Sequence, residues 1–138
     1  MAVLKNRAKM STSTTGTGTI TLGSAESGYQ TFADAGVANS DIVRYVIEDD
    51  AAWEIGTGTY TSSGTTLTRT VSESSNSDAA LNLSGAAVVF VGATAEDILQ
   101  PSGGTMTGNL ALGDSVKATF GTGGDLEIYH DGSNSYIS

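Results

Sequence analysis

The chain has 138 residues, a formal net charge of -9 and a sequence pI near 4.2. An acidic surface repels nucleic acids and anionic membranes, so we expect no nucleic-acid partner and no membrane insertion. The absence of cysteine excludes disulfides and thiolate chemistry. Only 15% of the residues are charged, 18 are glycine and one is proline, while threonine and serine are abundant. This composition predicts an all-β protein with many tight turns.

Residues 1–15 are predicted to form a polar N-terminal arm that ends in the Ser/Thr run 11–15. Lys5, Arg7 and Lys9 supply half of the six basic residues, and no acidic residue precedes Glu26. A basic arm on an acidic body could dock into an acidic pocket of a partner. The alternative interpretation is a solvated, frayed terminus, which is common at domain ends.

Residues 16–93 are predicted to form a small β-sandwich or barrel, because turn signals alternate with short apolar segments. The strongest strand signal is at 41–50, where Val43, Tyr45 and Ile47 lie on one face. The other strands are predicted at 16–22, 52–61, 64–74, 81–83 and 85–93. In the strand 64–74 the side chains expected to share a face are Leu67, Arg69 and Val71.

Trp53, the one tryptophan of the chain, is expected in the core of this domain, on the same side of its strand as Ile55. The domain has few other large side chains, so burying the indole contributes more there than at the surface. The alternative is a sugar-stacking platform made of Trp53, Tyr45 and Tyr60. That alternative predicts a carbohydrate-binding adhesin module.

Residues 94–101 are predicted to be a linker, with Pro101 halting any helix, and residues 102–138 a separate β-rich segment. The even positions of 110–120 are mostly apolar, which predicts an extended strand with one face against something apolar. Those positions are Leu110, Leu112, Asp114, Val116, Ala118 and Phe120. So short a segment encloses too little core alone. We therefore expect other copies or other proteins to supply the missing apolar surface.

Two motifs in this segment carry a family resemblance. SGGTMTGNLALG at 102–113, preceded by Pro101, resembles a short repeat found widely in bacteriophage tail fibres. GGDLEIYHDGSNSYIS at 123–138 resembles another fibre element, seen particularly in marine and cyanobacterial phages. The region from Ile20 to the apolar run 88–91 resembles a compact domain that recurs in phage structural proteins, often near the start of fibre chains.

The resemblance implies the tail-proximal part of a homotrimeric tail fibre located in the virion tail. Its N-terminal part would attach to the tail tube, an adaptor or a nozzle protein. A distal region, expected beyond residue 138, would meet the host surface receptor. The residues expected to attach the fibre are Leu4, Lys5, Arg7 and Lys9. Those expected to pack around the threefold axis of a shaft beginning at 102–138 are Leu110, Leu112, Val116, Phe120, Leu126 and Ile128.

A capsid-bound or collar-bound fibre would use the same architecture and is the nearest alternative. We expect no enzyme, because His130, the one histidine, has Asp131 and Ser133 beside it only by composition, and no nucleophile motif occurs. The acidic run 48–50 is adjacent in sequence rather than paired across a cleft, which indicates a solvated turn. We expect neither cofactor nor metal, although three copies of His130 near a threefold axis are an alternative metal or anion site.

Overall fold

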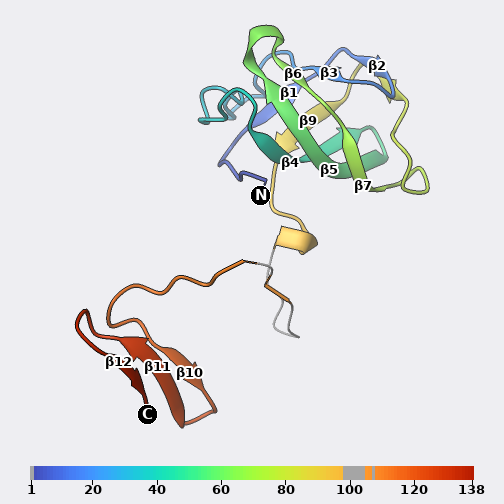
Figure 1. Ribbon diagram of the computed structural model, residues 1–138. Helices are drawn as coiled ribbons and strands as arrows, with labels where there is room; N and C mark the ends of the chain where they lie inside the picture. The colour runs from blue at the N-terminus through green and yellow to red at the C-terminus, as the bar shows by residue number, and fades with distance from the viewer. Residues whose placement is uncertain (1, 98–104, 107) are drawn as a thin grey trace. The chain divides into compact units, whose positions relative to one another are not determined.

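A computed structural model describes residues 2–97, 105–106 and 108–138 of the chain. The chain divides into two compact units, residues 1–98 and residues 99–138, which Figure 1 shows in blue to yellow and in orange to red. Regular structure in the described residues is almost entirely β, apart from the short 3-10 turns η1 (Ser62–Gly64) and η2 (Ala95–Asp97). The all-β prediction is confirmed. No helix in the described part of the chain is long and apolar enough to cross a membrane.

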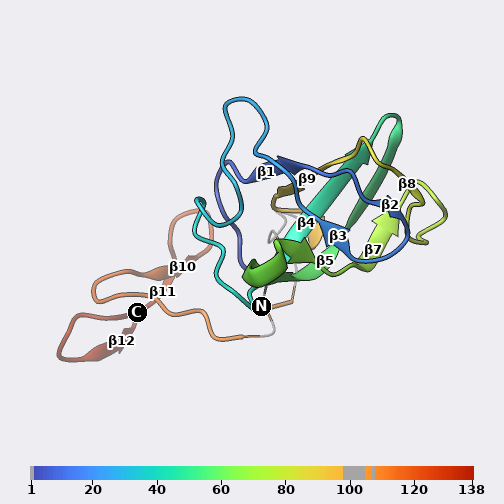
Figure 2. The same ribbon diagram turned by 90° about the horizontal axis from the view of Figure 1, so that it is seen from above.

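The first unit is built on one curled sheet that forms a half-barrel (Figure 1). Its strands in sheet order are β1 (Lys9–Ser11), β9 (Val88–Val91), β4 (Ile42–Asp49), β5 (Ala52–Thr61), β6 (Thr66–Leu67) and β3 (Ile20–Thr21), with β7 (Thr70–Ser74) beside β5. The two ends of this path approach each other, because the Ser11 N–H donates to the Ser24 carbonyl at 2.9 Å and the Gly23 N–H donates to the Ser11 carbonyl at 2.8 Å. A separate pair, β2 (Thr15–Gly16) and β8 (Leu83–Ser84), lies beside it (Figure 2).

The hairpin of β4 and β5 is the centre of the sheet. Asp49 pairs with Ala52, so the turn has two residues, and Asp50 adopts a left-handed φ of 53°, which aspartate tolerates better than most residues. This register places Ile47 opposite Glu54 and Tyr45 opposite Gly56. Because directly opposed residues share a face, the turn decides which side chains of β5 enter the core.

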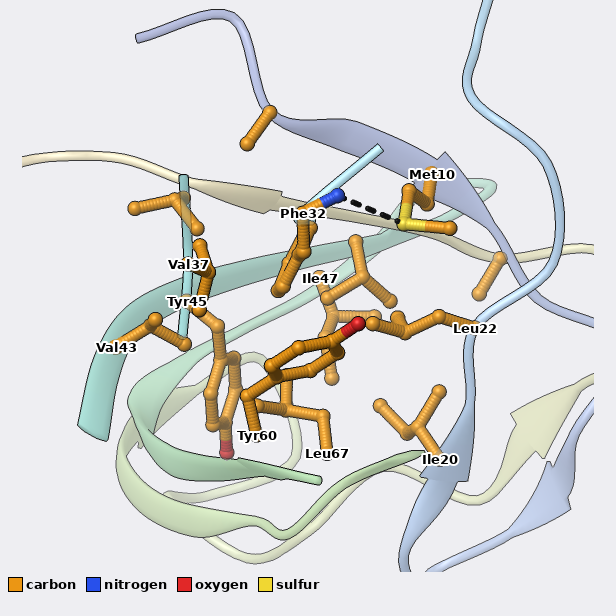
Figure 3. Packing of buried hydrophobic residues seen from close by; sticks show 14 of the residues in the cluster. Met10, Ile20, Leu22, Phe32, Val37, Val43, Tyr45, Ile47, Tyr60 and Leu67 are labelled. Atoms are coloured by element: carbon orange, nitrogen blue, oxygen red, sulfur yellow. Dashed lines mark hydrogen bonds between the residues drawn. The ribbon is translucent and has the colours of Figure 1, made fainter. Parts of the chain in front are cut away.

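The core lies inside the curl of this sheet (Figure 3). Val43, Tyr45 and Ile47 are fully buried, as their alternation predicted. Phe32 and Met10 cover them from other segments, and the Phe32 N–H points to the Met10 sulfur at 3.2 Å. Residues far apart in the sequence therefore supply the side chains that enclose the core.

The prediction of a separate arm at 1–15 is wrong. The strand β1 pairs with β9, Met10 and Ala8 are each 1% exposed, and Val3 forms a bridge to Val43. Ala8 and Met10 point inward while Lys9 points outward, a strand alternation that the polar composition of the segment conceals. The compact unit therefore includes the residues that were expected to reach for a partner.

The predicted linker 94–101 begins inside the first unit. The Arg44 guanidinium donates to Asp97 of η2, with 3.0 Å between Nε and Oδ2, and the Thr94 N–H donates to the same carboxylate at 3.1 Å. These contacts hold residues 94–97 on the sheet. Pro101 and the start of the predicted shaft at 102–104 lie outside the described residues.

The second unit is a three-stranded antiparallel sheet of β10 (Ala118–Phe120), β11 (Leu126–His130) and β12 (Ser135–Ile137), with β11 in the middle. The continuous strand predicted at 110–120 is wrong except at its end. The chain turns at Asp114 and Ser115, where Ser115 has a φ of 63° and its N–H donates to the His130 carbonyl at 2.6 Å. A turn at this point breaks the even-position register, because the alternation of a strand requires an unbroken extended backbone.

Candidate functional site

The candidate site is one face of the C-terminal sheet. Residues opposed in neighbouring strands share a face, and the register opposes Ala118 with Ile128, Ile128 with Ile137, and Phe120 with Leu126. The side chains so gathered, which we term the C-terminal apolar face, are Ala118, Phe120, Leu126, Ile128 and Ile137.

The large side chains of the C-terminal apolar face are exposed. Phe120 is 51% exposed, Leu126 39%, Ile128 44% and Ile137 78%. Scattered apolar side chains are ordinary on a protein surface, but a contiguous group on one sheet face is typical of an association surface. This face can bury apolar area only against another surface.

The opposite face of the same sheet is polar and internally paired. Tyr129 stacks on Tyr136 with 4.9 Å between ring centroids, and the Lys117 ammonium lies 4.7 Å from the Tyr129 ring centroid. The same ammonium lies 2.6 Å from a Glu127 carboxylate oxygen, a hydrogen bond that raises the pKa of Lys117. The sheet is therefore amphipathic, with its charged groups gathered on one side.

The turn between β11 and β12 is organised by Asp131. Its carboxylate accepts hydrogen bonds from the backbone N–H groups of Asn134 and Ser133, each at 2.8 Å, and from the Tyr136 hydroxyl at 2.9 Å. These donors, the backbone of Asn134 first, lower the pKa of Asp131. The turn fixes the register that places Ile137 opposite Ile128.

The six residues predicted for threefold packing fall into two groups. Phe120, Leu126 and Ile128 lie together on the C-terminal apolar face. Those outside the sheet are exposed as well: Leu110 is 64% exposed, Val116 50% and Leu112 44%. The sequence reasoning missed Ile137, although the alternation in 135–137 after the Asp-Gly turn at 131–132 could have revealed it.

His130 is exposed and belongs to the same side of β11 as Ile128, two residues away. Its Nδ1 lies 3.2 Å from the Ser135 hydroxyl oxygen, so its polar partner in the described chain is a hydroxyl. Across 2–97, 105–106 and 108–138, no three His, Asp or Glu side chains gather as the ligands of a metal would.

The predicted attachment residues lie on the first unit, and two of the three cations have partners there. Lys9 lies 3.1 Å from a Glu48 carboxylate oxygen and 4.9 Å from the Phe90 ring centroid. The Arg7 guanidinium donates to the Gly28 carbonyl and lies 4.2 Å over the Tyr29 ring. Lys5 is half-buried and Leu4 is 48% exposed. Lys9 and Arg7 therefore hold local structure as well as presenting positive charge.

The expectation that Trp53 is a core residue is wrong, and so is the platform of three aromatic rings. Trp53 lies on the outer face of the sheet and is 36% exposed, whereas Tyr45 and Tyr60 are buried. The two-residue turn after Asp49 is the cause, because it assigns the inward position to Glu54. The indole is therefore a single exposed ring on a strand.

The sequence reasoning also missed a buried ion pair. Glu54 is fully buried and accepts hydrogen bonds from Arg69 Nε at 2.9 Å, from the Tyr45 hydroxyl at 2.7 Å and from the Leu81 N–H at 2.8 Å. Burial alone raises the pKa of Glu54, but these donors, Arg69 foremost, hold it below its ordinary value. Burial, with Glu54 beside it, raises the pKa of Tyr45. Arg69 also donates to the Gly16 and Leu81 carbonyls, which joins three segments.

Comparison with protein-family models, with curated proteins and with solved structures found no match to this chain.

Proposed function

We propose that this chain is a structural component of a phage virion, the tail-proximal part of a homotrimeric tail fibre, and not an enzyme. The observation that carries the proposal is the C-terminal apolar face, whose large side chains are between 39% and 78% exposed. The tail-fibre assignment itself is supported by the two motifs at 102–113 and 123–138.

Association through this face has a clear physical basis. A three-stranded sheet of short strands is close to the minimum for independent stability. Fully burying a large apolar side chain stabilises by about 1.5–3 kcal/mol, so burying half-exposed ones contributes on the order of 1 kcal/mol each. Packing of three copies would repeat that gain at every interface. The polar face, with Lys117, Glu127 and the two tyrosines, would stay in water.

In this proposal the first unit attaches the fibre to the tail tube, an adaptor or a nozzle protein. Leu4 and Lys5 are the candidates for direct contact, because Arg7 and Lys9 already have partners within the unit. Attachment to the capsid or collar would use the same surfaces. Host-receptor binding in this proposal belongs to a more distal region of the fibre.

Sedimentation equilibrium of the full chain tests the proposal. We expect a species of three times the chain mass of 14.0 kDa. The double variant Phe120→Ser with Ile128→Ser should dissociate it, because both side chains lie on the C-terminal apolar face. Ile42→Ser is the matched control, since Ile42 is 46% exposed on the first unit and should leave the mass unchanged.

A monomer at every concentration would contradict the proposal. So would a trimer that the double variant does not weaken, because association would then use another surface. Loss of the trimer in the Ile42→Ser control would assign the interface to the first unit instead.

A further inference from the structure

The outer face of the sheet in the first unit carries an aromatic residue with charged neighbours. Trp53 is directly opposite Glu48 in the β4–β5 ladder, so the two side chains share this face about 5 Å apart at their Cβ atoms. Trp53 is 36% exposed, and the Glu48 side chain is 50% exposed. An indole and a carboxylate are thus presented side by side to solvent.

The backbone below the indole is held from both sides. On one side Trp53 belongs to the β4–β5 ladder. On the other, its N–H donates to the Ser75 hydroxyl at 3.0 Å and its carbonyl accepts from the Ser75 N–H at 3.0 Å. A ring mounted on a fixed strand loses little conformational freedom when a ligand stacks on it.

The ion pair that begins at Glu48 provides both kinds of hydrogen-bonding partner. The Glu48 carboxylate, opposite Trp53, is an acceptor, and the Lys9 ammonium, 3.1 Å from that carboxylate, has three N–H donors, more than this ion pair uses. Small-molecule sites combine apolar and aromatic side chains with a few polar groups that fix the orientation of the ligand, and Trp53 with its charged neighbours supplies both kinds. The ligand that fits has a flat face of C–H groups and a rim of hydroxyls, each of which both donates and accepts.

We propose that Trp53, Glu48 and Lys9 form a binding site for the pyranose ring of a neutral saccharide. The sugar face stacks on the indole, and its hydroxyls bond the carboxylate and the ammonium. A quaternary ammonium group is a poorer fit, because it is recognised by a cage of several rings and Tyr45 and Tyr60 are buried. A nucleobase also stacks on indole, but the chain's net charge of -9 opposes nucleic acid. The site does not depend on trimer formation.

Fluorescence of the intact chain tests this directly, because Trp53 is its one tryptophan. The probes are methyl β-glucoside, methyl β-galactoside and N-acetylglucosamine, with choline as a comparison. We expect a saturable change in emission and protection from acrylamide quenching, with half-saturation on the order of 1 mM or weaker for a single ring. A response to choline without one to any saccharide overturns the proposal, as does no saturable response to any saccharide.

Variants assign the signal to the residues. In saturation-transfer NMR observed on the sugar, Trp53→Ala should abolish the transfer, and Glu48→Gln should weaken binding about tenfold, as expected for losing a charged acceptor. Trp53→Phe should retain weaker binding, and it replaces the alanine variant if that chain unfolds. Ile42→Ser should bind as the unchanged chain does. Binding that survives both Trp53→Ala and Glu48→Gln shows that the sugar sits elsewhere and overturns the proposal.

Discussion

The buried pair of Glu54 and Arg69 is the residue-level feature on which the first unit most depends. Its side chains are 0% and 2% exposed, and an unpaired charge in such a place is strongly unfavourable. Arg69→Met should therefore lower the free energy of unfolding by about 3–5 kcal/mol, because Glu54 stays buried without its partner. Urea unfolding followed by Trp53 fluorescence measures this loss.

Two further variants check the reason for that loss. Lys9→Met breaks an ion pair whose side chains are 21% and 50% exposed, and it should cost about 1 kcal/mol or less. The double variant Arg69→Met with Glu54→Leu should regain much of the stability, since no charge is left buried. Equal losses for Arg69→Met and Lys9→Met would show that burial does not decide the cost.

The same pair predicts how stability depends on pH. The pKa of Glu54 is lowered in the folded protein from an ordinary value of 4.5. The stabilisation of the folded state by ionised Glu54 is therefore complete above pH 4.5, and it is lost as the pH falls through the lowered folded-state pKa. The midpoint temperature of thermal unfolding, measured at a series of pH values from neutral to below 4.5, should fall more steeply for the unchanged chain than for Glu54→Gln. Parallel curves would mean that other carboxylates dominate acid unfolding.

At the scale of elements, Gly58 lets β5 pass close to the strand that returns along it. A Cβ at this position would overlap the Thr68 carbonyl oxygen and lie 2.9 Å from Leu67 Cδ1. Gly58→Ala should therefore destabilise the unit by about 2–3 kcal/mol through overpacking. Gly18→Ala is the control, because a Cβ there would meet nothing within 4 Å, and its effect should stay within about 0.5 kcal/mol. Urea midpoints of the two variants compare them, and similar midpoints would contradict this packing.

Local pattern predicted some elements and not others. The strand β4 could be predicted because Val43, Tyr45 and Ile47 alternate within one segment. The face of the sheet on which Trp53 lies could not be predicted from hydrophobicity, because the turn after Asp49 sets the register of β5 against β4. The strand β1 was missed because its three residues gain strand geometry from β9 and residues 24–30, a tertiary effect that local propensity does not contain.

At the scale of the whole molecule, the candidate site could be predicted only in part, because local alternation predicts the face of a strand but not contacts between distant segments. Leu126 and Ile128 alternate within one strand, and Phe120 pairs with Leu126 across a short turn. The face that these three residues share can therefore be predicted from residues close together in the sequence. Leu110 and Leu112 lie before the turn at Asp114, and the period does not continue through that turn. The hydrogen bonds of Arg69 to the Gly16 and Leu81 carbonyls join residues that are 53 and 12 positions apart in the sequence. A periodic pattern within one segment cannot predict contacts between segments so far apart.

The division of the chain gives a last prediction. Among the residues that the structure describes, the buried apolar core lies between Ala8 and Val91, within the first unit, so a chain of residues 1–97 should fold. We expect it to be monomeric, because it lacks the C-terminal apolar face, and to unfold at the temperature at which the first unit of the full chain unfolds. Sedimentation equilibrium and thermal unfolding followed by Trp53 fluorescence measure both properties.

A shorter chain of residues 1–93 tests where the first unit ends. It lacks Asp97, whose carboxylate holds Arg44 at 3.0 Å, so it should unfold several degrees lower, about the shift that 1 kcal/mol produces in a domain of this size. Equal midpoints for the two truncated chains would show that residues 94–97 are a linker after all. A trimer formed by residues 1–97 would place the association surface on the first unit and refute packing through the C-terminal apolar face.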